Sequence, residues 1–233
     1  MEIIITDLTR FSKPEKVCIA GININTGECI RPLPYITFEK CKELNILPGS
    51  KLNGEFTKNN NRGCPHIEDS YYKNLKHSGA STGDDFKQAL EKDLKASIAD
   101  GFEYQFPQGG KIIPHTNPPK QSIITLKVNP SQIRIVEDSY NPGKIKLNFQ
   151  DNDSKKYTYL PITDLGFYNY ALKHFQDVDF PKNINTFIDS QDELYLRIGL
   201  SGRYESNGRD GYWLQVNGIY TFPNFDLEIR SYS

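Results

Sequence analysis

The sequence predicts a mainly β protein with a few helices, arranged as two halves that each hold several short strands and one helix. Short apolar runs rich in β-branched and aromatic residues alternate with turn signals along most of the chain. Aromatic residues make up 12% of the 233 residues, which also favours strands. Only two segments carry an apolar stripe of helical period. A chain of this length can form one large β domain or two small ones.

The first half begins with a predicted strand at Ile3–Ile5. A hairpin is expected between residues 17–22 and 28–33, because Asn25-Thr26-Gly27 between two apolar runs is typical of a turn. We expect a short helical segment at Thr37–Leu44 and a further strand at Ser50–Phe56.

The best helix predicted in the chain is Asp84–Phe102. Thr82 or Asp84 can cap this helix, Gly101 can end it, and its apolar face recurs at Phe86, Leu90, Leu94 and Ile98. The connector that follows, Phe106–Pro119, contains two adjacent glycines and several prolines, a composition typical of a domain boundary. We therefore predict an N-terminal domain at residues 1–118 and a C-terminal domain at residues 119–233.

The second half contains short predicted strands at regular spacing, at residues 122–128, 132–136, 144–149 and 156–160. This spacing of strands and turns favours a small barrel. A second helix is expected at Thr163–Phe175, with its apolar stripe at Leu165, Tyr168, Leu172 and Phe175. A closing hairpin, formed by two strands around a long polar loop, begins at Leu194 and ends at Phe222.

Composition and cysteine usage restrict the class of protein. The formal net charge is −1, so contact with nucleic acid requires a local basic patch. The N-terminus lacks the features of a signal peptide, and no segment is long and apolar enough to span a membrane. The four cysteines, Cys18, Cys29, Cys41 and Cys64, form no CxxC pair and are expected to be buried free thiols in a reducing cytoplasm. A zinc site from Cys41, Cys64 and His66 is a minor alternative, because the spacing fits no common framework.

Two groups of polar residues in the first half are candidates for ligand binding. Arg10 and Arg31 each lie at the end of a strand-like run, where a guanidinium can bind phosphate or carboxylate, or pair with a nearby acid. His66, Glu68 and Asp69 form an H-x-E-D cluster. Such a cluster can supply a general base and metal-binding carboxylates, or it can stabilise a loop through local hydrogen bonds. A nucleobase deaminase is not favoured, because no C-x-x-C follows the H-x-E pattern.

The closing hairpin holds the remaining candidates. The segment Gly199–Arg203 is not a nucleophile elbow, and we interpret Ser201, Arg203 and the glycines as a backbone approach to an anion or as a flexible loop. If the side chains of the second strand alternate strictly, one face carries Trp213, Gln215, Asn217 and Ile219. The other face then carries Tyr212, Leu214, Val216 and Tyr220. The first face offers a stacking ring and two amides, or these side chains contribute to the core.

Four segments together resemble the prokaryotic dual OB-containing domain proteins. The segments are TDLTRF with VCIAG (residues 6–11 and 17–21), TGECIRPLP (26–34), CPHIED (64–69) and LYLRIGLS with YWLQVNGIYTFP (within 194–223). The resemblance implies two five-stranded OB-type barrels and a nucleic-acid or nucleotide ligand, and it implies no enzymatic activity. Arg10, Arg31, His66, Glu68, Asp69, Arg197 and Trp213 occupy the matching motif positions. Gly202 separates Ser201 from Arg203, which departs from the family pattern and leaves the role of Arg203 open.

We therefore expect a module that binds single-stranded nucleic acid or nucleotide without catalysis, without a cofactor and without a metal, in bacterial defence or genome maintenance. The expected ligand-binding residues are Arg10, Arg31, His66, Glu68, Asp69, Arg197, Ser201, Arg203, Trp213, Gln215 and Asn217. One alternative is a metal-dependent enzyme on nucleotide or nucleic acid that uses His66, Glu68 and Asp69. Another is an adaptor whose aromatic face docks a protein partner.

Overall fold

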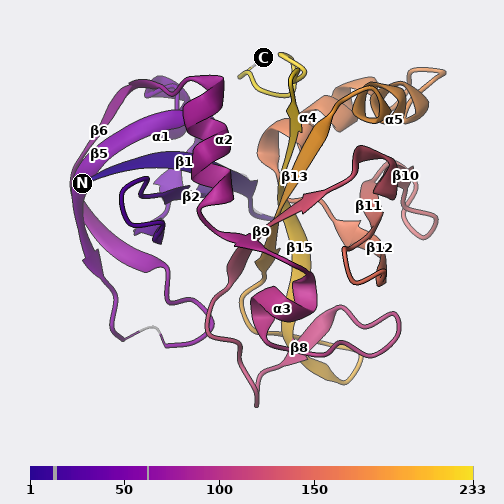
Figure 1. Ribbon diagram of the computed structural model, residues 1–233, viewed down its shortest axis with the longest axis horizontal. Coiled ribbons are helices and arrows are strands. Elements are labelled where there is room, and N and C mark those ends of the chain that lie inside the picture. Colours follow the sequence, from indigo (N-terminus) through magenta and orange to yellow (C-terminus); the bar gives the residue numbers. More distant parts are fainter. Residues whose placement is uncertain (13–14, 62, 233) are drawn as a thin grey trace.

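Two small β-barrels lie side by side in the computed structural model, which describes residues 1–12, 15–61 and 63–232 (Figure 1). The first barrel, drawn from indigo to purple, contains the N-terminal strands. The second, drawn from pink to yellow, contains the C-terminal strands, and α2 (Gly83–Glu91) begins the connection between the two. The predicted mainly β class is confirmed.

The first barrel is a closed ring of five strands. They are β1 (Glu2–Arg10), β2 (Lys16–Ile22), β3 (Cys29–Leu33), β5 (Ser50–Lys58) and β6 (Asp69–Ala80). β1 pairs with β2 and β5, β2 pairs with β3, β5 pairs with β6, and the parallel pair β3–β6 closes the ring. This is the Greek-key order of an OB barrel. β4 (Ile36–Thr37) pairs antiparallel with the start of β2, and α1 (Phe38–Glu43) follows β4.

The second barrel repeats this order with one interruption. Its strands are β9 (Ile123–Val128), β10 (Ile133–Glu137), β11 (Ile145–Gln150), β12 (Lys156–Pro161), β13 (Glu193–Leu200) and β15 (Arg209–Phe222). A single 3₁₀ turn, η1 (Pro130–Gln132), separates β9 from β10. β10–β11–β12 form one sheet, β9–β13–β15 form another, and a parallel bridge from Ile162 to Val216 joins them. If β9 and β10 are taken as one bent first strand, both barrels have the same strand order.

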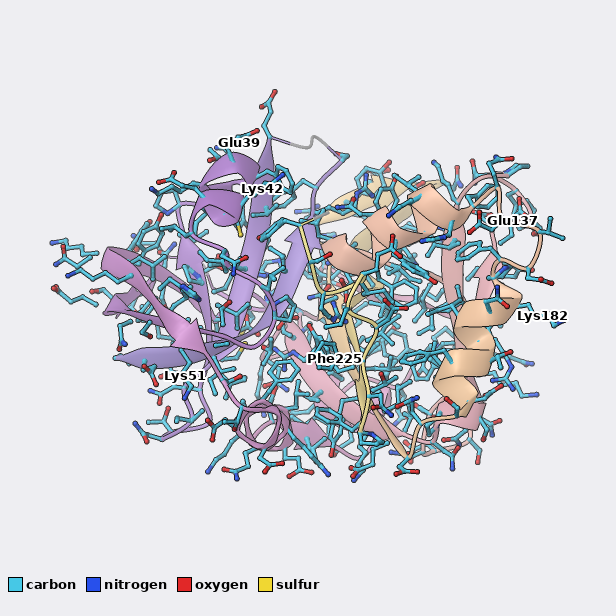
Figure 2. The ribbon with its side chains drawn as sticks, turned by 90° about the horizontal axis from the view of Figure 1, so that it is seen from above. Glu39, Lys42, Lys51, Glu137, Lys182 and Phe225 are labelled. Carbon is cyan, nitrogen blue, oxygen red and sulfur yellow. The ribbon has the colours of Figure 1, made fainter. Side chains whose placement is uncertain are left out.

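Shorter elements complete the second barrel. β7 (Leu94–Lys95) pairs with β9, β8 (Ile112–Pro114) pairs with β15, and β14 (Tyr204–Ser206) forms a hairpin with the start of β15. α4 (Leu165–His174) and α5 (Lys182–Asp189) lie between β12 and β13 in the chain. Figure 2 places Lys182 of α5 and Glu137 of β10 at the end of the second barrel away from the first.

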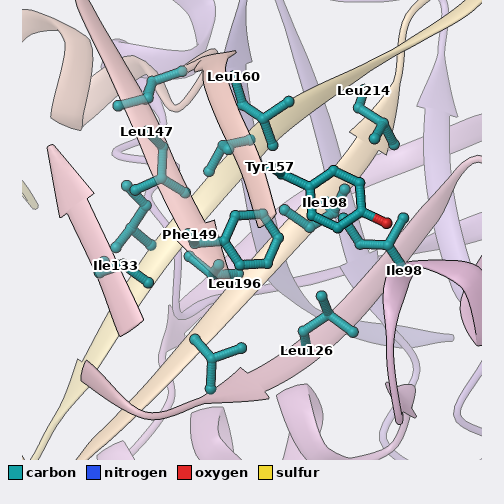
Figure 3. Close-up of a cluster of buried hydrophobic side chains, with 14 of the residues drawn as sticks. Ile98, Leu126, Ile133, Leu147, Phe149, Tyr157, Leu160, Leu196, Ile198 and Leu214 are labelled. Atoms are coloured by element: carbon teal, nitrogen blue, oxygen red, sulfur yellow. The ribbon is translucent and has the colours of Figure 1, made fainter. Parts of the chain in front are cut away.

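The larger hydrophobic core fills the second barrel (Figure 3). Its side chains include Ile98, Leu126, Ile133, Leu147, Phe149, Tyr157, Leu160, Leu196, Ile198 and Leu214, all of them buried. The rings of Phe149 and Tyr157 stack with centroids 5.4 Å apart. α3 (Ile98–Phe102) and Ile113 also belong to this core, so the segment before residue 118 packs with the second barrel. The division into domains after residue 118 stays a prediction.

The predicted helix at 84–102 is wrong, because the segment forms two helices separated by β7. Thr82 caps α2, but the backbone then becomes extended at Leu94 and Lys95 and pairs with β9. The side chain of Ser97 caps α3 by accepting a hydrogen bond from the amide of Asp100 at 3.1 Å. Leu94 is 38% exposed, so the apolar repeat did not represent one buried face.

The second predicted helix is confirmed in place but its buried stripe is not the predicted one. α4 buries Leu165, Phe167 and Ala171, whereas Leu172 is 53% exposed. The sequence analysis also missed α5 and the twelve-residue strand β6. β6 carries many polar residues because most of its side chains are at least partly exposed to solvent.

The predicted strands at 17–22, 28–33 and 50–56 and the short helix at 37–44 are confirmed, within a few residues at each end. The strand predicted at 3–5 is confirmed but continues to Arg10 as β1. The four predicted short strands of the second half are confirmed as β9 to β12.

A β-bulge corrects the predicted faces of the closing strand. Arg197 pairs with Gly218 and Ile198 with Val216, so Asn217 is an extra residue on β15. The bulge moves Ile219 into the second core beside Leu214 and Val216. Beyond a bulge the alternation of faces reverses, which a strict count of two cannot predict.

Candidate functional site

A polar cavity of about 650 Å³ lies between the two barrels. It is lined by Asp7, Thr9, Arg10, Phe11, Ser12, Cys18, Ala20, Arg31, Tyr35, His66, Ile123, Lys144, Thr163, Leu200, Ser201, Gly202, Gln215 and Asn217. β1, β2 and β3 supply one wall, and β15 with the loop after β13 supplies the other. The cavity brings together Arg10, Arg31, His66, Ser201, Gln215 and Asn217 of the predicted site.

Arg31 is held in one orientation at the cavity wall. The parallel pairing of β3 and β6 sets Arg31 directly opposite Asp69, and its Nε donates to Asp69 Oδ1 at 2.5 Å. Its Nη1 donates to Ser122 Oγ at 3.5 Å, across the boundary between the barrels. The residue is only 6% exposed. Because a guanidinium is planar, these contacts also fix the direction of Nη2.

Glu68 joins the barrels. Its carboxylate accepts hydrogen bonds from the Ser122 amide at 2.6 Å, the Ser122 hydroxyl at 2.9 Å and the Ile123 amide at 3.2 Å. Its backbone carbonyl accepts from the amide of Arg31 at 2.8 Å. Burial raises the pKa of Glu68, while Arg31 and Ser122 act in the opposite direction. Glu68 and Asp69 therefore engage partners within the protein, and neither lines the cavity.

His66 lies at the cavity, and the residue is 7% exposed. The ring meets Tyr212 edge to face, with centroids 5.9 Å apart. Glu68 is the next candidate in the sequence, but its carboxylate points to Ser122 and Ile123. The H-x-E-D cluster is therefore divided between the cavity and the contact between barrels.

Two basic side chains reach the cavity from more exposed positions. The Arg10 guanidinium lies 3.8 Å from the centre of the Tyr168 ring, and its backbone amide donates to the Thr163 carbonyl. Lys144, at the turn between β10 and β11, is exposed and lines the same cavity. The only carboxylate among the described lining residues is Asp7, which is paired with Arg197. The lining is therefore positively charged.

Aromatic rings and amides complete the lining. Phe11 and Tyr35 lie with ring centroids 4.8 Å apart, at an interplanar angle of 57°. Gln215 Nε2 donates to Asn217 Oδ1 at 3.0 Å, and the Thr163 hydroxyl donates to the same oxygen at 3.1 Å. Rings stack on bases or sugars, and amides recognise base edges.

Arg197 lies outside the cavity and is fully buried. Its Nε and Nη2 contact Asp7 Oδ2 at 2.9 and 2.8 Å, and its Nη1 donates to Thr125 Oγ1 at 2.7 Å and lies 3.5 Å from Asp93. Nη2 also contacts the sulfur of Cys29 at 3.4 Å. All three nitrogens thus have partners inside the protein, in contacts that join the two barrels.

Of the candidate residues in the closing hairpin, Ser201 lines the cavity, whereas Arg203 and Trp213 do not. Ser201 lines the cavity, and its hydroxyl accepts from the Trp213 amide at 3.0 Å. Arg203 is exposed and pairs with Asp210 at 2.5 Å, outside the cavity. Trp213 is half-buried, its Nε1 donates to the Tyr204 carbonyl at 3.1 Å, and it does not line the cavity.

Several residues at this site were not predicted. Phe11 directly follows Arg10, so the segment itself carried a signal, and Tyr35 follows the run that contains Arg31. No local pattern indicates Lys144 or Ser122, because they meet the first barrel only after folding.

The four cysteines are free thiols, as predicted, but only Cys41 is fully buried and Cys64 is exposed. Burial raises the pKa of the Cys18 thiol at the cavity to about 11, so this thiol is neutral at pH 7. Within the residues that the structure describes, no group of three or more His, Cys, Asp or Glu side chains is placed to hold a metal ion. None of the described helices combines the length and apolar character needed to cross a membrane.

A family model described as the dual OB-containing domain matches residues 1–219 of this chain. The match covers both barrels and ends within the last strand, before the C-terminal segment. Searches of the curated proteins and of the solved structures find no match. With the two OB-type strand orders described above, the family match shows that this chain belongs to the dual OB-containing domain family.

Proposed function

We propose that this protein is a binding module for single-stranded nucleic acid or nucleotide, and that the ligand lies in the cavity between the two barrels. The observation that carries the proposal is the cavity lining, which combines Arg10, Arg31 and Lys144 with the Phe11–Tyr35 ring pair. Dual OB domains suggest a module of this type, although an OB barrel also suits sugars and proteins.

The chemistry of the lining supports a nucleotide unit over a neutral ligand. Guanidinium and ammonium groups bind phosphate, the ring pair offers an apolar surface, and Gln215 and Asn217 offer donors and acceptors for a base edge. Asp7, the single carboxylate among the described lining residues, is already neutralised by Arg197. A phosphate therefore meets little repulsion there.

A longer strand can leave the cavity along β15. Gln215 lines the cavity, and Trp213 is two residues away on the same strand, a spacing of about 7 Å in extended backbone. The Arg209 guanidinium lies 5.3 Å from the centre of the Trp213 ring, which adds a cation beside a stacking surface. Trp213 is thus proposed to contact a second nucleotide outside the cavity.

Fluorescence anisotropy with labelled single-stranded DNA and RNA of about twelve nucleotides, within the site sizes known for OB folds, tests the proposal. We expect binding that weakens as salt rises. Arg10→Gln and Lys144→Gln should each lower the affinity and reduce the slope of log K against log salt by about 0.7 per lost phosphate contact. Arg134→Gln is the matched control, because Arg134 is a half-exposed arginine paired with Asp189 and does not line the cavity.

Binding of mononucleotides is measured in parallel by calorimetry at low salt. Absence of binding to every polymer and every mononucleotide would overturn the proposal. Equal losses for Arg134→Gln and Arg10→Gln would also overturn it, because binding would then reflect general surface charge and not the cavity.

A further inference from the structure

The orientation of Arg31 suggests which part of a nucleotide enters the cavity. Asp69 and Ser122 engage its Nε and Nη1, and within the described residues Nη2 has no hydrogen-bond partner. Nη2 is itself buried, and a buried donor without a partner costs free energy. Arg31 lines the cavity, so its fixed guanidinium can donate the one remaining hydrogen bond to an anion.

The size of the cavity favours binding of one nucleotide unit over binding of a stretch of several nucleotides. About 650 Å³ lies within the range of about 300–1,000 Å³ that is typical of sites for single small molecules. Single strands on OB barrels normally follow an open groove over several nucleotides. Here Phe11, Ser12 and Tyr35 line both the cavity and a neighbouring shallow hollow of about 390 Å³. A strand whose end lies inside can therefore also leave the cavity past the ring pair, as an alternative to the path along β15.

The charges favour a terminal phosphate over an internal one. A phosphomonoester carries about −1.5 to −2 charges at pH 7, whereas each internal phosphodiester carries one. Asp69 offsets the charge of Arg31, and Arg197 offsets that of Asp7. No ion pair joins Arg10 or Lys144 to a carboxylate of the described residues, so two cations of the lining keep their charge for a ligand. This matches a dianion better than a monoanion.

We propose that the cavity binds a terminal phosphomonoester, with a phosphate oxygen accepting from Arg31 Nη2 and with Arg10 and Lys144 neutralising its charge. The group is supplied either by a free nucleoside monophosphate or by the phosphorylated end of a single strand. This inference rests on the proposed function and specifies the part of the ligand that is recognised.

Matched ligands test the inference directly. Calorimetry compares an oligothymidylate that carries a 5′ phosphate, one with a 3′ phosphate and one with hydroxyls at both ends, together with thymidine monophosphate and thymidine. We expect one phosphorylated end to bind on the order of tenfold tighter than the hydroxyl end, as a charge-assisted hydrogen bond would give. Binding of thymidine monophosphate alone identifies the free nucleotide as the source. Binding of only the phosphorylated oligomer identifies the strand end.

Gly202→Leu provides a variant that adds a bulky side chain at the cavity lining. Gly202 lines the cavity, and a Cβ added there meets no described atom within 4 Å. Gly83→Leu is the control, because Gly83 is equally unobstructed and lies at the start of α2, outside the cavity. We expect Gly202→Leu to abolish the preference for a phosphorylated end and to keep the melting temperature, while Gly83→Leu changes neither.

Arg31→Lys supplies a second test. A lysine can keep the ion pair with Asp69 but lacks the fork that directs Nη2, so the preference for a terminal phosphate should fall on the order of tenfold. Equal affinity for phosphorylated and hydroxyl ends would overturn this inference and leave the proposed function standing. An unchanged preference in Gly202→Leu would overturn it in the same way. Failure of every ligand to bind would overturn both this inference and the proposed function.

Discussion

Arg31 and Arg197 form two buried arginine centres that have nearly the same surroundings and different consequences. Each lies on a strand, each pairs with a buried aspartate, and each contacts a side chain of the other barrel. Arg197 is 0% exposed and its three nitrogens all contact protein atoms, whereas Arg31 lines the cavity with Nη2 unpaired among the described residues. Arg197 thus joins the barrels, while Arg31 both joins them and faces the proposed ligand.

The difference comes from the number of partners around each guanidinium. Arg197 meets two carboxylates, of Asp7 and Asp93, together with Thr125 and Cys29. Arg31 meets Asp69 and the more distant Ser122 hydroxyl. A donor that the protein leaves unpaired is available to a ligand, whereas a fully paired arginine would lose internal contacts on binding.

The largest expected effect is that of Arg197→Met on stability. The substitution leaves Asp7 buried without its cation and leaves Asp93 with Lys95 alone, which should lower the free energy of unfolding by about 3–5 kcal/mol. Urea denaturation measures the loss. Arg134→Met is the control and should cost at most about 1 kcal/mol, because its pair with Asp189 is exposed. A loss for Arg197→Met no larger than that of the control would contradict a structural role for Arg197.

A smaller effect is expected at the contact that both barrels share near Arg31. Ser122→Ala removes a donor to Glu68 and the acceptor of Arg31 Nη1, and it leaves two backbone donors to Glu68 in place. The expected cost is about 1–3 kcal/mol in the free energy of unfolding, measured by urea denaturation. If Arg31 binds the ligand while held by Ser122, affinity should also fall. Unchanged stability and unchanged affinity would show that this contact holds neither the barrels nor Arg31.

Glu193, the first residue of β13, leads to a prediction about the pH dependence of stability. Hydrogen bonds from Lys127 and Lys87 lower the pKa of Glu193 from 4.5 to about 2. A carboxyl group with a lowered folded pKa stabilises the protein above its unfolded pKa, and this stability is lost as the pH falls. Glu193→Gln should therefore flatten the decline in stability between about pH 4.5 and 2. Thermal melts of both proteins across this range test it, and parallel curves would contradict it.

The smallest expected effect is that of Arg203→Ala. Arg203 forms an exposed pair with Asp210, so its removal should leave the free energy of unfolding almost unchanged. Arg203 lies outside the cavity lining, so the affinity for mononucleotides should stay the same. Calorimetry on Arg203→Ala beside Arg10→Gln measures both effects. A loss of affinity as large as that of Arg10→Gln would place the ligand on the hairpin loop instead of in the cavity.

Local signals predicted the elements that depend on local chemistry. The Asn25-Thr26-Gly27 turn predicted the β2–β3 hairpin, and Thr82 was correctly proposed as a helix cap. The extent of the helix after Thr82 could not be predicted, because pairing of Leu94 and Lys95 with β9 outweighs the apolar repeat. The faces of β15 were wrong beyond Asn217, because a bulge depends on the register with β13.

The candidate site was predicted only in part for a similar reason. Arginine beside a strand can act as an ion-pair partner or as a ligand contact, and the sequence does not distinguish Arg31 from Arg197. Glu68 was expected to face a ligand, but its carboxylate accepts from Ser122, which is 54 residues away in the chain. Such partners are identified only when the two barrels are in contact.

The sequence by itself determined the strand-rich class, the repeated spacing of strands and turns, and the family resemblance, because these depend on residues that are close in the chain. Only the tertiary structure decided which charges meet, because Arg31, Ser122 and Lys144 come from segments that fold into different barrels. The cavity is the space left between those barrels, so its lining is a property of their packing and not of any one motif.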